Sequence, residues 1–99
     1  MTAANRALDL NPRHTLARNL IGSTYARQGQ LDAARQAFRA ALDANPAEPS
    51  TYTNLGMLEL DAGDPRAAIS YFAESLTLDP ADERARSQLA AALAAASPR

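Results

Sequence analysis

Few side chains in this sequence could do chemistry, and the most reactive of them is a single histidine. His14 follows Pro12 and precedes the first long helix that the sequence predicts. A metal site would need further ligands at helical spacing, such as a second histidine four residues on, and the sequence has none. We therefore expect His14 to lie in an exposed linker or to cap the following helix, and we predict no metal site.

The carboxylates are spread along the chain rather than paired. Those at expected turns and on polar helix faces serve solubility and helix capping: Asp32, Asp43, Asp61, Asp64 and Glu74. None is placed with a partner for general acid–base catalysis, and the glycines form no phosphate-binding cluster. The lack of cysteine excludes a thiolate nucleophile and a cysteine-based zinc site. The sequence therefore predicts no catalytic residue and no cofactor, which is the pattern of a protein that is not an enzyme.

The composition predicts an all-helical fold and argues against nucleic-acid binding. Hydrophobic residues make up 46% and charged residues 21% of the 99 residues, as in ordinary soluble globular domains. The chain has 24 alanines and 13 leucines but only two isoleucines and no valine, so helix formers dominate over strand formers. The formal net charge is -1 and no basic face is evident, so we expect no nucleic-acid partner.

Neither a membrane span nor a signal peptide is visible in the sequence. The longest apolar run, 89–96, has eight residues and is mostly alanine, whereas a membrane-spanning helix needs about 20. Residues 1–10 contain Arg6 and Asp9 where a signal peptide would need an apolar stretch. We expect no membrane insertion and a cytoplasmic location, with the periplasm as the alternative if the chain belongs to a longer exported protein. All ten basic residues are arginine, which is typical of a GC-rich bacterial genome.

A period of 34 residues organises the chain, and repeats of this length are typical of helical solenoids. Special residues recur at this offset in the following sets: Leu8, Leu42 and Leu76; Pro12, Pro46 and Pro80; Gly22 and Gly56; Gly29 and Gly63; Ala34 and Ala68; Phe38 and Phe72. We predict one domain over 1–99, with complete units at 15–48 and 49–82. Residues 1–14 match the end of a unit, as the second helix of a partial repeat, and residues 83–99 match its beginning, as a terminal or capping helix.

Each unit is predicted to form two antiparallel helices. Apolar residues at spacings of three and four, such as Ala34 and Phe38, favour helix. Gly29 can close a helix in the left-handed conformation, Pro46 cannot continue one, and Asp64 can cap the start of one. The expected helices are at about 2–10, 15–28, 31–44, 49–62 and 65–78, with a last helix, capped by Asp82, that ends near 96.

The pattern resembles the tetratricopeptide repeat, a helix–turn–helix unit of about 34 residues. The residues that carry the resemblance are Gly22, Tyr25, Ala34, Phe38, Ala41, Pro46, Tyr52, Leu55, Gly56, Ala68, Phe72 and Pro80. Three positions depart from the family pattern: Arg18 replaces an aromatic residue, Glu59 a tyrosine and Ser75 an alanine. The resemblance implies an all-α, right-handed superhelix of about six helices, in which Gly22 lets two helices approach closely and Phe38 fills the space beside them.

By the same resemblance, the first helix of each unit lines the concave inner surface of the superhelix. The candidate partner-binding residues are Leu16, Asn19, Leu20, Ser23, Arg27, Thr53, Asn54, Met57, Leu60, Arg84 and Gln88, with Ala26 and Asp61 on the same helix faces. Apolar side chains would supply contact area, and amides and guanidinium groups would orient a ligand. We therefore expect a protein or peptide partner in this groove. The alternative is that Leu16, Leu20 and Leu60 only complete the packing between helices.

Some members of the family bind the C-terminal carboxylate of heat-shock chaperones through a clamp of lysine, asparagine and arginine side chains. Here Asn54 matches the middle asparagine and Arg84 matches one basic position. Asn19, Ser23 and Gln88 stand where lysine, asparagine and arginine are expected. Because the chain has no lysine, this clamp would lose most of the positive charge that captures a carboxylate, so we do not expect chaperone-tail binding.

The two ends of the chain leave three interpretations of the function. The last helix carries Leu89, Leu93 and a run of alanines, so it is either a cap or a surface that a further unit or another chain covers. Our main prediction is a non-enzymatic protein–protein interaction module that binds a peptide or helix in the groove. One alternative is an oligomerisation element that self-associates through its terminal helices, and the other is a docking segment of a larger bacterial multidomain protein.

Overall fold

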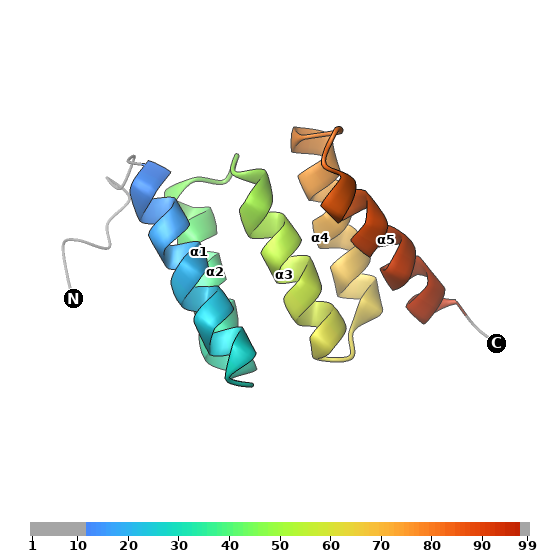
Figure 1. Cartoon of the computed structure of the whole chain (residues 1–99), viewed down its shortest axis with the longest axis horizontal. Helices are drawn as coiled ribbons and strands as arrows, with labels where there is room; N and C mark the ends of the chain where they lie inside the picture. Colours follow the sequence, from blue (N-terminus) through green and yellow to red (C-terminus); the bar gives the residue numbers. More distant parts are fainter. Residues whose placement is uncertain (1–11, 98–99) are drawn as a thin grey trace.

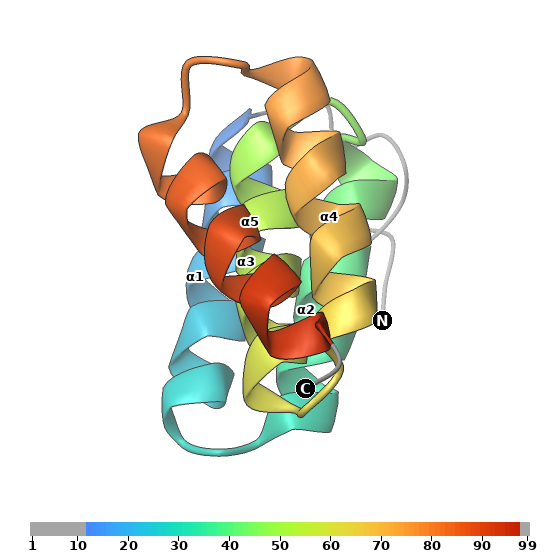
Figure 2. The ribbon, with the colours of Figure 1, turned by 90° about the vertical axis from the view of Figure 1, so that its right-hand side faces the viewer.

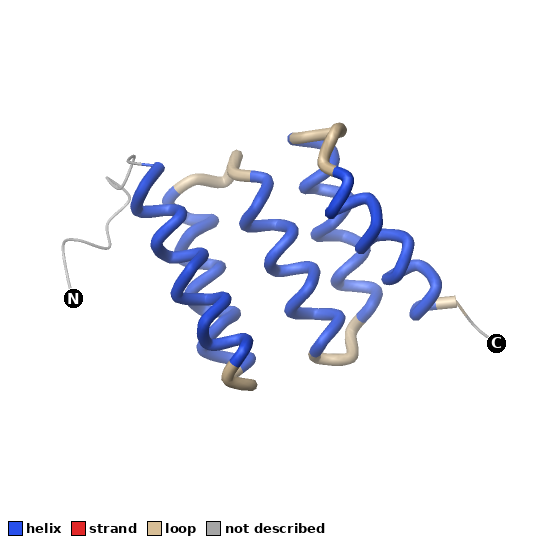
Figure 3. Tube along the Cα trace, viewed as in Figure 1, coloured by secondary structure: helices blue, strands red, loops and turns tan. Residues whose placement is uncertain are grey.

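The computed structural model describes residues 12–97, and every regular element in that part of the chain is a helix. The helices are α1 (Pro12–Arg27), α2 (Leu31–Ala44), α3 (Pro49–Asp61), α4 (Pro65–Leu78) and α5 (Glu83–Ala96). Figure 1 shows them side by side along the longest axis of the molecule, and Figure 3 shows the short loops that join them. The all-α fold predicted from the sequence is confirmed, while the helix expected at Thr2–Leu10 lies outside the described residues.

The helices lie in two layers. Figure 2 shows α1, α3 and α5 in one layer and α2 and α4 in the other. Contacts join α1 to α2 and α3 to α4 within the predicted units, and α2 to α3 and α4 to α5 between them. In addition, α1 contacts α3, and α3 contacts α5. The first helices of successive units therefore share one face of the molecule, which is the arrangement that the predicted groove requires.

A glycine of the first helix and a phenylalanine of the second hold each pair together. A Cβ atom built on Gly22 would lie 2.5 Å from the Phe38 ring, and one built on Gly56 would lie 2.4 Å from the Phe72 ring. Both rings are buried, so they have no room to move away. The predicted close approach of two helices at Gly22 is thus present, and it recurs 34 residues later.

The helix boundaries follow from glycine turns, which repeat in both units, and from aspartate caps on α4 and α5. Gly29 and Gly63 adopt φ values of +78° and +87°, the left-handed conformation that ends a helix and that glycine adopts without strain. Asp64 and Asp82 each accept a hydrogen bond from the backbone N–H three residues on, which caps α4 and α5. The turn at Gly29 and both aspartate caps match the sequence predictions.

The buried core runs across the boundaries between units. One cluster joins Ala34 and Phe38 of α2 to Leu55 and Leu58 of α3. A second cluster joins α4 to α5 through the residues Ala68, Phe72 and Ala92. Each helix pair is therefore stabilised by its neighbour along the stack, as in solenoid proteins, where units contact mainly the next unit.

The start of α1 differs from the sequence prediction. The helix begins at Pro12, three residues before the expected Thr15. Residues 12–14, which the sequence assigned to the opening partial unit, therefore belong to α1, and His14 lies in the first turn of a helix rather than in a linker. The physical reason is that proline fits the first turn of a helix, because its fixed φ is helical and no N–H is needed there.

The departure at Glu59 is compensated by an arginine on the preceding helix. Arg35 of α2 donates from Nε to Glu59 Oε2 at 2.9 Å and from Nη2 to Glu59 Oε1 at 3.1 Å. Arg35 also bonds Asp32 one helical turn away, at 2.9 Å. Hydrogen bonding to Glu59 raises the pKa of Arg35 above its usual value. An ion pair between α2 and α3 thus occupies the space where the family pattern has a tyrosine.

The departure at Ser75 is compensated within the second unit. The Ser75 hydroxyl donates to the Pro49 carbonyl at 3.0 Å and lies 2.7 Å from Thr53 Oγ1. Ser75 and Thr53 are both buried between α3 and α4. Because the added hydroxyl has partners, the register of the helix pair tolerates serine in place of alanine.

Candidate binding groove

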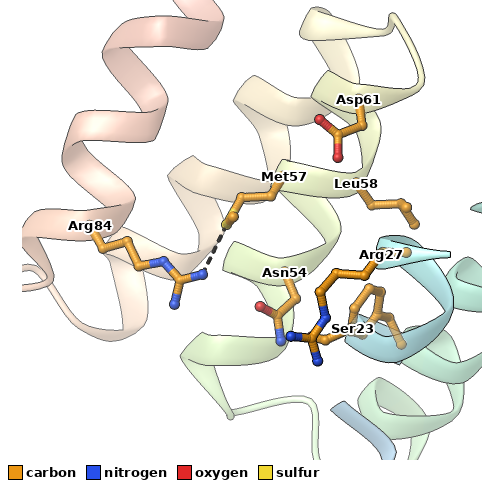
Figure 4. Close-up of a pocket in the computed structure, with 9 residues that line it drawn as sticks. Ser23, Arg27, Asn54, Met57, Leu58, Asp61 and Arg84 are labelled. Atoms are coloured by element: carbon orange, nitrogen blue, oxygen red, sulfur yellow. Dashed lines mark hydrogen bonds between the residues drawn. The ribbon is translucent and has the colours of Figure 1, made fainter. Parts of the chain in front are cut away.

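A pocket opens on the face that the first helices share. Its volume is about 400 Å³, and its lining residues come from α1, α3 and α5, with Phe38 from α2. They are Ser23, Ala26, Arg27, Phe38, Asn54, Met57, Leu58, Asp61 and Arg84 (Figure 4). The pocket therefore spans both predicted units and the terminal helix, so a ligand bound in it would contact three successive first helices.

The floor of the pocket is apolar and belongs to the core. Phe38 and Leu58 are almost completely buried and belong to the cluster that joins α2 to α3. Met57 of α3 packs against the second cluster, which joins α4 to α5. Because these side chains are held by core packing, the floor is preformed, and a ligand would not need to order it.

Three polar side chains stand above this floor: Arg27, Asn54 and Arg84. The Arg84 guanidinium donates to Met57 Sδ at 3.2 Å, and sulfur is a weak acceptor. Within residues 12–97, neither Arg27 nor Arg84 pairs with a carboxylate. Figure 4 shows the Arg27 guanidinium and the Asn54 amide pointing into the same part of the pocket. These groups offer several N–H donors to whatever enters the groove.

Asp61 carries the pocket's negative charge. It lies one helical turn beyond Met57 on α3 and is exposed. Figure 4 places its carboxylate at the opposite end of the pocket from Asn54. The charged lining residues are therefore two arginines and one aspartate, which gives the pocket a net charge of +1.

The structure brings five of the predicted groove residues together and places the others elsewhere. Those that line the pocket are Ser23, Arg27, Asn54, Met57 and Arg84. Leu16 and Leu20 are 54% and 64% exposed on α1 but do not line the pocket. Leu60 is half-buried against the second core cluster, and Gln88 is half-buried on α5. Of the leucines that the sequence suggested for the groove, Leu16 and Leu20 are thus exposed on α1 outside the pocket, and Leu60 packs against the core.

Two predicted groove residues are not accessible to a ligand. Asn19 is 5% exposed, and its amide nitrogen donates to Ser50 Oγ at 3.2 Å and Thr51 Oγ1 at 3.0 Å, which links α1 to α3. Thr53 is 2% exposed and bonds Ser75 between α3 and α4. Both expectations fail for one reason: the two residues hold the same position in successive units, and that position faces neighbouring helices.

Sequence reasoning missed the pocket floor. Phe38 was assigned only to the contact with Gly22, and Leu58 was not singled out. Since both are core residues that also close the pocket, an apolar pattern cannot distinguish this double role from ordinary packing.

No sign of a metal site or a membrane span accompanies the groove. Among residues 12–97, no three histidine, aspartate or glutamate side chains gather where they could hold a metal ion. The helices of the same part of the chain are too short or too polar to cross a bilayer.

Helix pairs stacked in two layers, with a groove along the first helices, define an α-helical repeat solenoid. The family model for the tetratricopeptide repeat matches residues 14–81. The chain therefore belongs to the tetratricopeptide repeat family, as the sequence pattern predicted.

Two known proteins show how far the similarity extends. The BBSome complex member BBS4 of Bos taurus is 32% identical over 81 residues, which is 82% of this chain. The chain spans only 15% of the length of that relative. The first tetratricopeptide-repeat domain of Spaghetti (RPAP3), solved with an HSP90 peptide, superposes with a TM-score of 0.83 at 24% identity. That match covers 87% of this chain and 68% of the other and shows a common fold, a right-handed superhelix of helix pairs.

Proposed function

We propose that this chain is a non-enzymatic interaction module that binds a peptide segment of a partner protein in the pocket between α1, α3 and α5. The observation that carries the proposal is that Arg27, Asn54 and Arg84 present free N–H donors above a preformed apolar floor. Apolar contact area with a few orienting polar groups is the usual composition of a peptide-recognition groove.

The size and rigidity of the pocket support a small docked segment. A volume of about 400 Å³ lies within the range of about 300–1,000 Å³ that is usual for ligand sites. Because the floor is already packed, binding would cost little ordering of the protein. The RPAP3 domain with the same fold has a peptide bound, which fits this mode of recognition.

The chaperone-tail clamp of the family is a poor description of this groove. Asn19 occupies one of the clamp positions and is buried between α1 and α3, so it cannot reach a ligand. Only Asn54 and Arg84 both match the clamp and line the pocket. We therefore propose peptide binding through a different set of contacts, in which Arg27 takes part.

Selection from a library of random dodecapeptides displayed on phage tests the proposal. Peptides enriched on the wild-type chain should bind at least about tenfold more weakly to the double variant Asn54→Ala/Met57→Ala, which removes one amide and one apolar contact from the pocket. The matched control is Ser70→Ala/Glu74→Ala, two exposed positions on α4. Circular dichroism checks that all variants stay helical. Equal binding by the pocket variant, or no enriched peptide at all, would contradict the proposal.

Self-association is a second candidate, and exposed apolar side chains at both ends of the stack favour it. Leu16, Leu20 and Ile21 are exposed on α1, and Leu93 is 50% exposed on α5. Such surfaces can mark protein interfaces. Light scattering across concentrations tests this: a mass above one chain that falls when Leu93 is replaced by serine supports it, and a constant monomeric mass contradicts it.

A further inference from the structure

We propose that the peptide bound in the groove carries an acidic side chain, a glutamate or aspartate within its sequence, that docks between Arg27 and Arg84. This rests on the proposed function, because it names the chemistry of the segment that the same pocket accepts. The proposal commits to a side-chain carboxylate and an adjoining apolar residue, not to a free C-terminal carboxylate.

The first argument is the state of the two arginines. Elsewhere in the chain, Arg35 is satisfied by the carboxylates of Asp32 and Glu59. By contrast, Arg84 has only the sulfur of Met57 as an acceptor, and Arg27 pairs with no carboxylate in the described part of the chain. A guanidinium group presents five N–H donors in a plane that matches a carboxylate. Both arginines in the pocket are therefore available for a carboxylate from a partner.

The second argument is the surroundings of the arginines. Asn54 lies in the pocket lining on α3, the helix between α1 and α5. Its amide points toward the Arg27 guanidinium (Figure 4). A carboxylate there would have two cationic donors and one neutral donor within the same pocket. Charge-assisted hydrogen bonds of this kind are stronger than neutral ones.

The third argument concerns the residue next to the acid. Met57, Leu58 and Phe38 line the same pocket as these donors and have apolar side chains. These side chains offer no strong hydrogen-bond partner, and burying a polar or charged group without one is costly. The part of the ligand that covers them must therefore be apolar. The ligand that fits is therefore an acidic residue beside an apolar one.

Asp61 limits how acidic the ligand can be. The lining charges of Arg27, Arg84 and Asp61 sum to +1, so a single carboxylate neutralises the pocket. A second acidic side chain that reached toward Asp61 would be repelled. The structure therefore favours a segment with one well-placed acid over a run of acids.

The test uses random dodecapeptides fused to the phage coat protein through their C-termini, so that no free peptide carboxylate is presented. Selection is carried out on the wild type, on Arg27→Gln/Arg84→Gln, and on Arg39→Gln/Arg66→Gln. The last variant loses the same charge from exposed positions on α2 and α4. We expect one acidic residue beside an apolar one to be enriched by the wild type and by the Arg39/Arg66 control, and the acid to be lost from peptides selected on the pocket variant.

Synthetic peptides then measure the effect on affinity. The most enriched sequence is made N-acetylated and C-amidated, together with its Glu→Gln or Asp→Asn counterpart. We expect this neutralisation to weaken binding at least tenfold for the wild type and the control, and less than twofold for the pocket variant. A third peptide with a free C-terminal carboxylate should bind no more tightly than the amidated one.

The outcomes separate this proposal from the proposed function. Enriched peptides without an acid, equal acid preference in the pocket variant, or a strict need for the free C-terminus would overturn the acidic-side-chain proposal and leave peptide binding intact. Failure to enrich any peptide on the wild type would overturn both.

Discussion

Arg35 of α2 and Glu59 of α3 form a two-bonded ion pair that joins successive repeats. The distances are 2.9 Å from Nε to Oε2 and 3.1 Å from Nη2 to Oε1. Thirty-four residues later, the same two positions hold Ile69 and Leu93, on α4 and α5. One interface between repeats is thus polar where the next is apolar, although the backbone arrangement repeats.

This relationship predicts how the pair responds to substitution. Arg35→Ile should cost about 2–3 kcal/mol because it leaves the Glu59 carboxylate buried without its partner. Glu59→Leu should cost about 1 kcal/mol, since Arg35 keeps its hydrogen bond to Asp32 and remains in contact with solvent. The double variant, which copies the Ile69 and Leu93 positions, should be at least as stable as the wild type. Thermal unfolding followed by circular dichroism measures the stability of all three variants. A double variant less stable than the wild type would contradict the prediction.

The contact between Gly56 and Phe72 predicts a large effect from one methyl group. Gly56→Ala places a Cβ atom 2.4 Å from the buried ring, so we expect a loss of about 1–3 kcal/mol of stability from overpacking. In a Phe72→Leu background the same substitution should cost much less, because the clashing ring atoms are gone. Urea denaturation of the four chains gives the coupling energy, and additive effects would argue against the contact.

The hydroxyl pair of Thr53 and Ser75 predicts a third result. Ser75→Ala restores the residue that the family pattern has, yet it should cost about 1 kcal/mol because Thr53 Oγ1 loses its 2.7 Å partner in a buried site. Thr53→Val combined with Ser75→Ala removes both hydroxyls and should recover most of that loss. Chemical denaturation decides the matter, and a stabilised Ser75→Ala variant would show that the pair contributes nothing.

The partial burial of Tyr52 predicts that the stability of the fold depends on pH in the alkaline range. Burial, with a smaller contribution from the Glu74 charge, raises the pKa of Tyr52 above 10.0. In the unfolded chain the phenol ionises at its ordinary pKa, so the stability that the neutral form contributes is present below that value and is lost as pH rises through the folded-state pKa. Stability should therefore decline from about pH 10 in the wild type and less so in Tyr52→Phe.

That experiment has a spectroscopic readout and a control. The difference in tyrosinate absorbance between wild type and Tyr52→Phe reports the titration of this one side chain. Glu74→Gln removes the charge and should move the pKa back toward 10.0. A Tyr52 titration at or below the ordinary tyrosine pKa would contradict the burial that the structure shows.

The sequence was sufficient for the fold because its repeat is marked by residues with unique geometric roles. Gly22 and Phe38 recur as Gly56 and Phe72, and each pair fixes how two helices pack. The glycine turns and aspartate caps are equally local signals. The start of α1 at Pro12 was missed because proline serves both to end one helix and to begin the next.

The groove was predicted only in part, and the errors have a single physical origin. Helix periodicity places a residue on a face to within about one position, or 100°, which is the difference between facing the groove and facing the neighbouring helix. Asn19 looks like a groove residue because it is polar, but its amide nitrogen donates to Ser50 and Thr51 on α3 in the interior. Thr53, which holds the same position in the next unit, is also buried. The same repeat position was therefore assigned to the wrong helix face in both units.

The most direct test of peptide binding is to map the bound peptide by amide chemical-shift changes in nuclear magnetic resonance spectra of the labelled chain. On titration with an enriched, C-amidated peptide, we predict that the largest shifts cluster on the pocket-lining residues Ser23, Arg27, Asn54, Met57 and Arg84. The outer faces of α2 and α4 should change little. Shifts concentrated on α2 and α4, or confined to Leu93 and its neighbours on α5, would contradict binding in the groove.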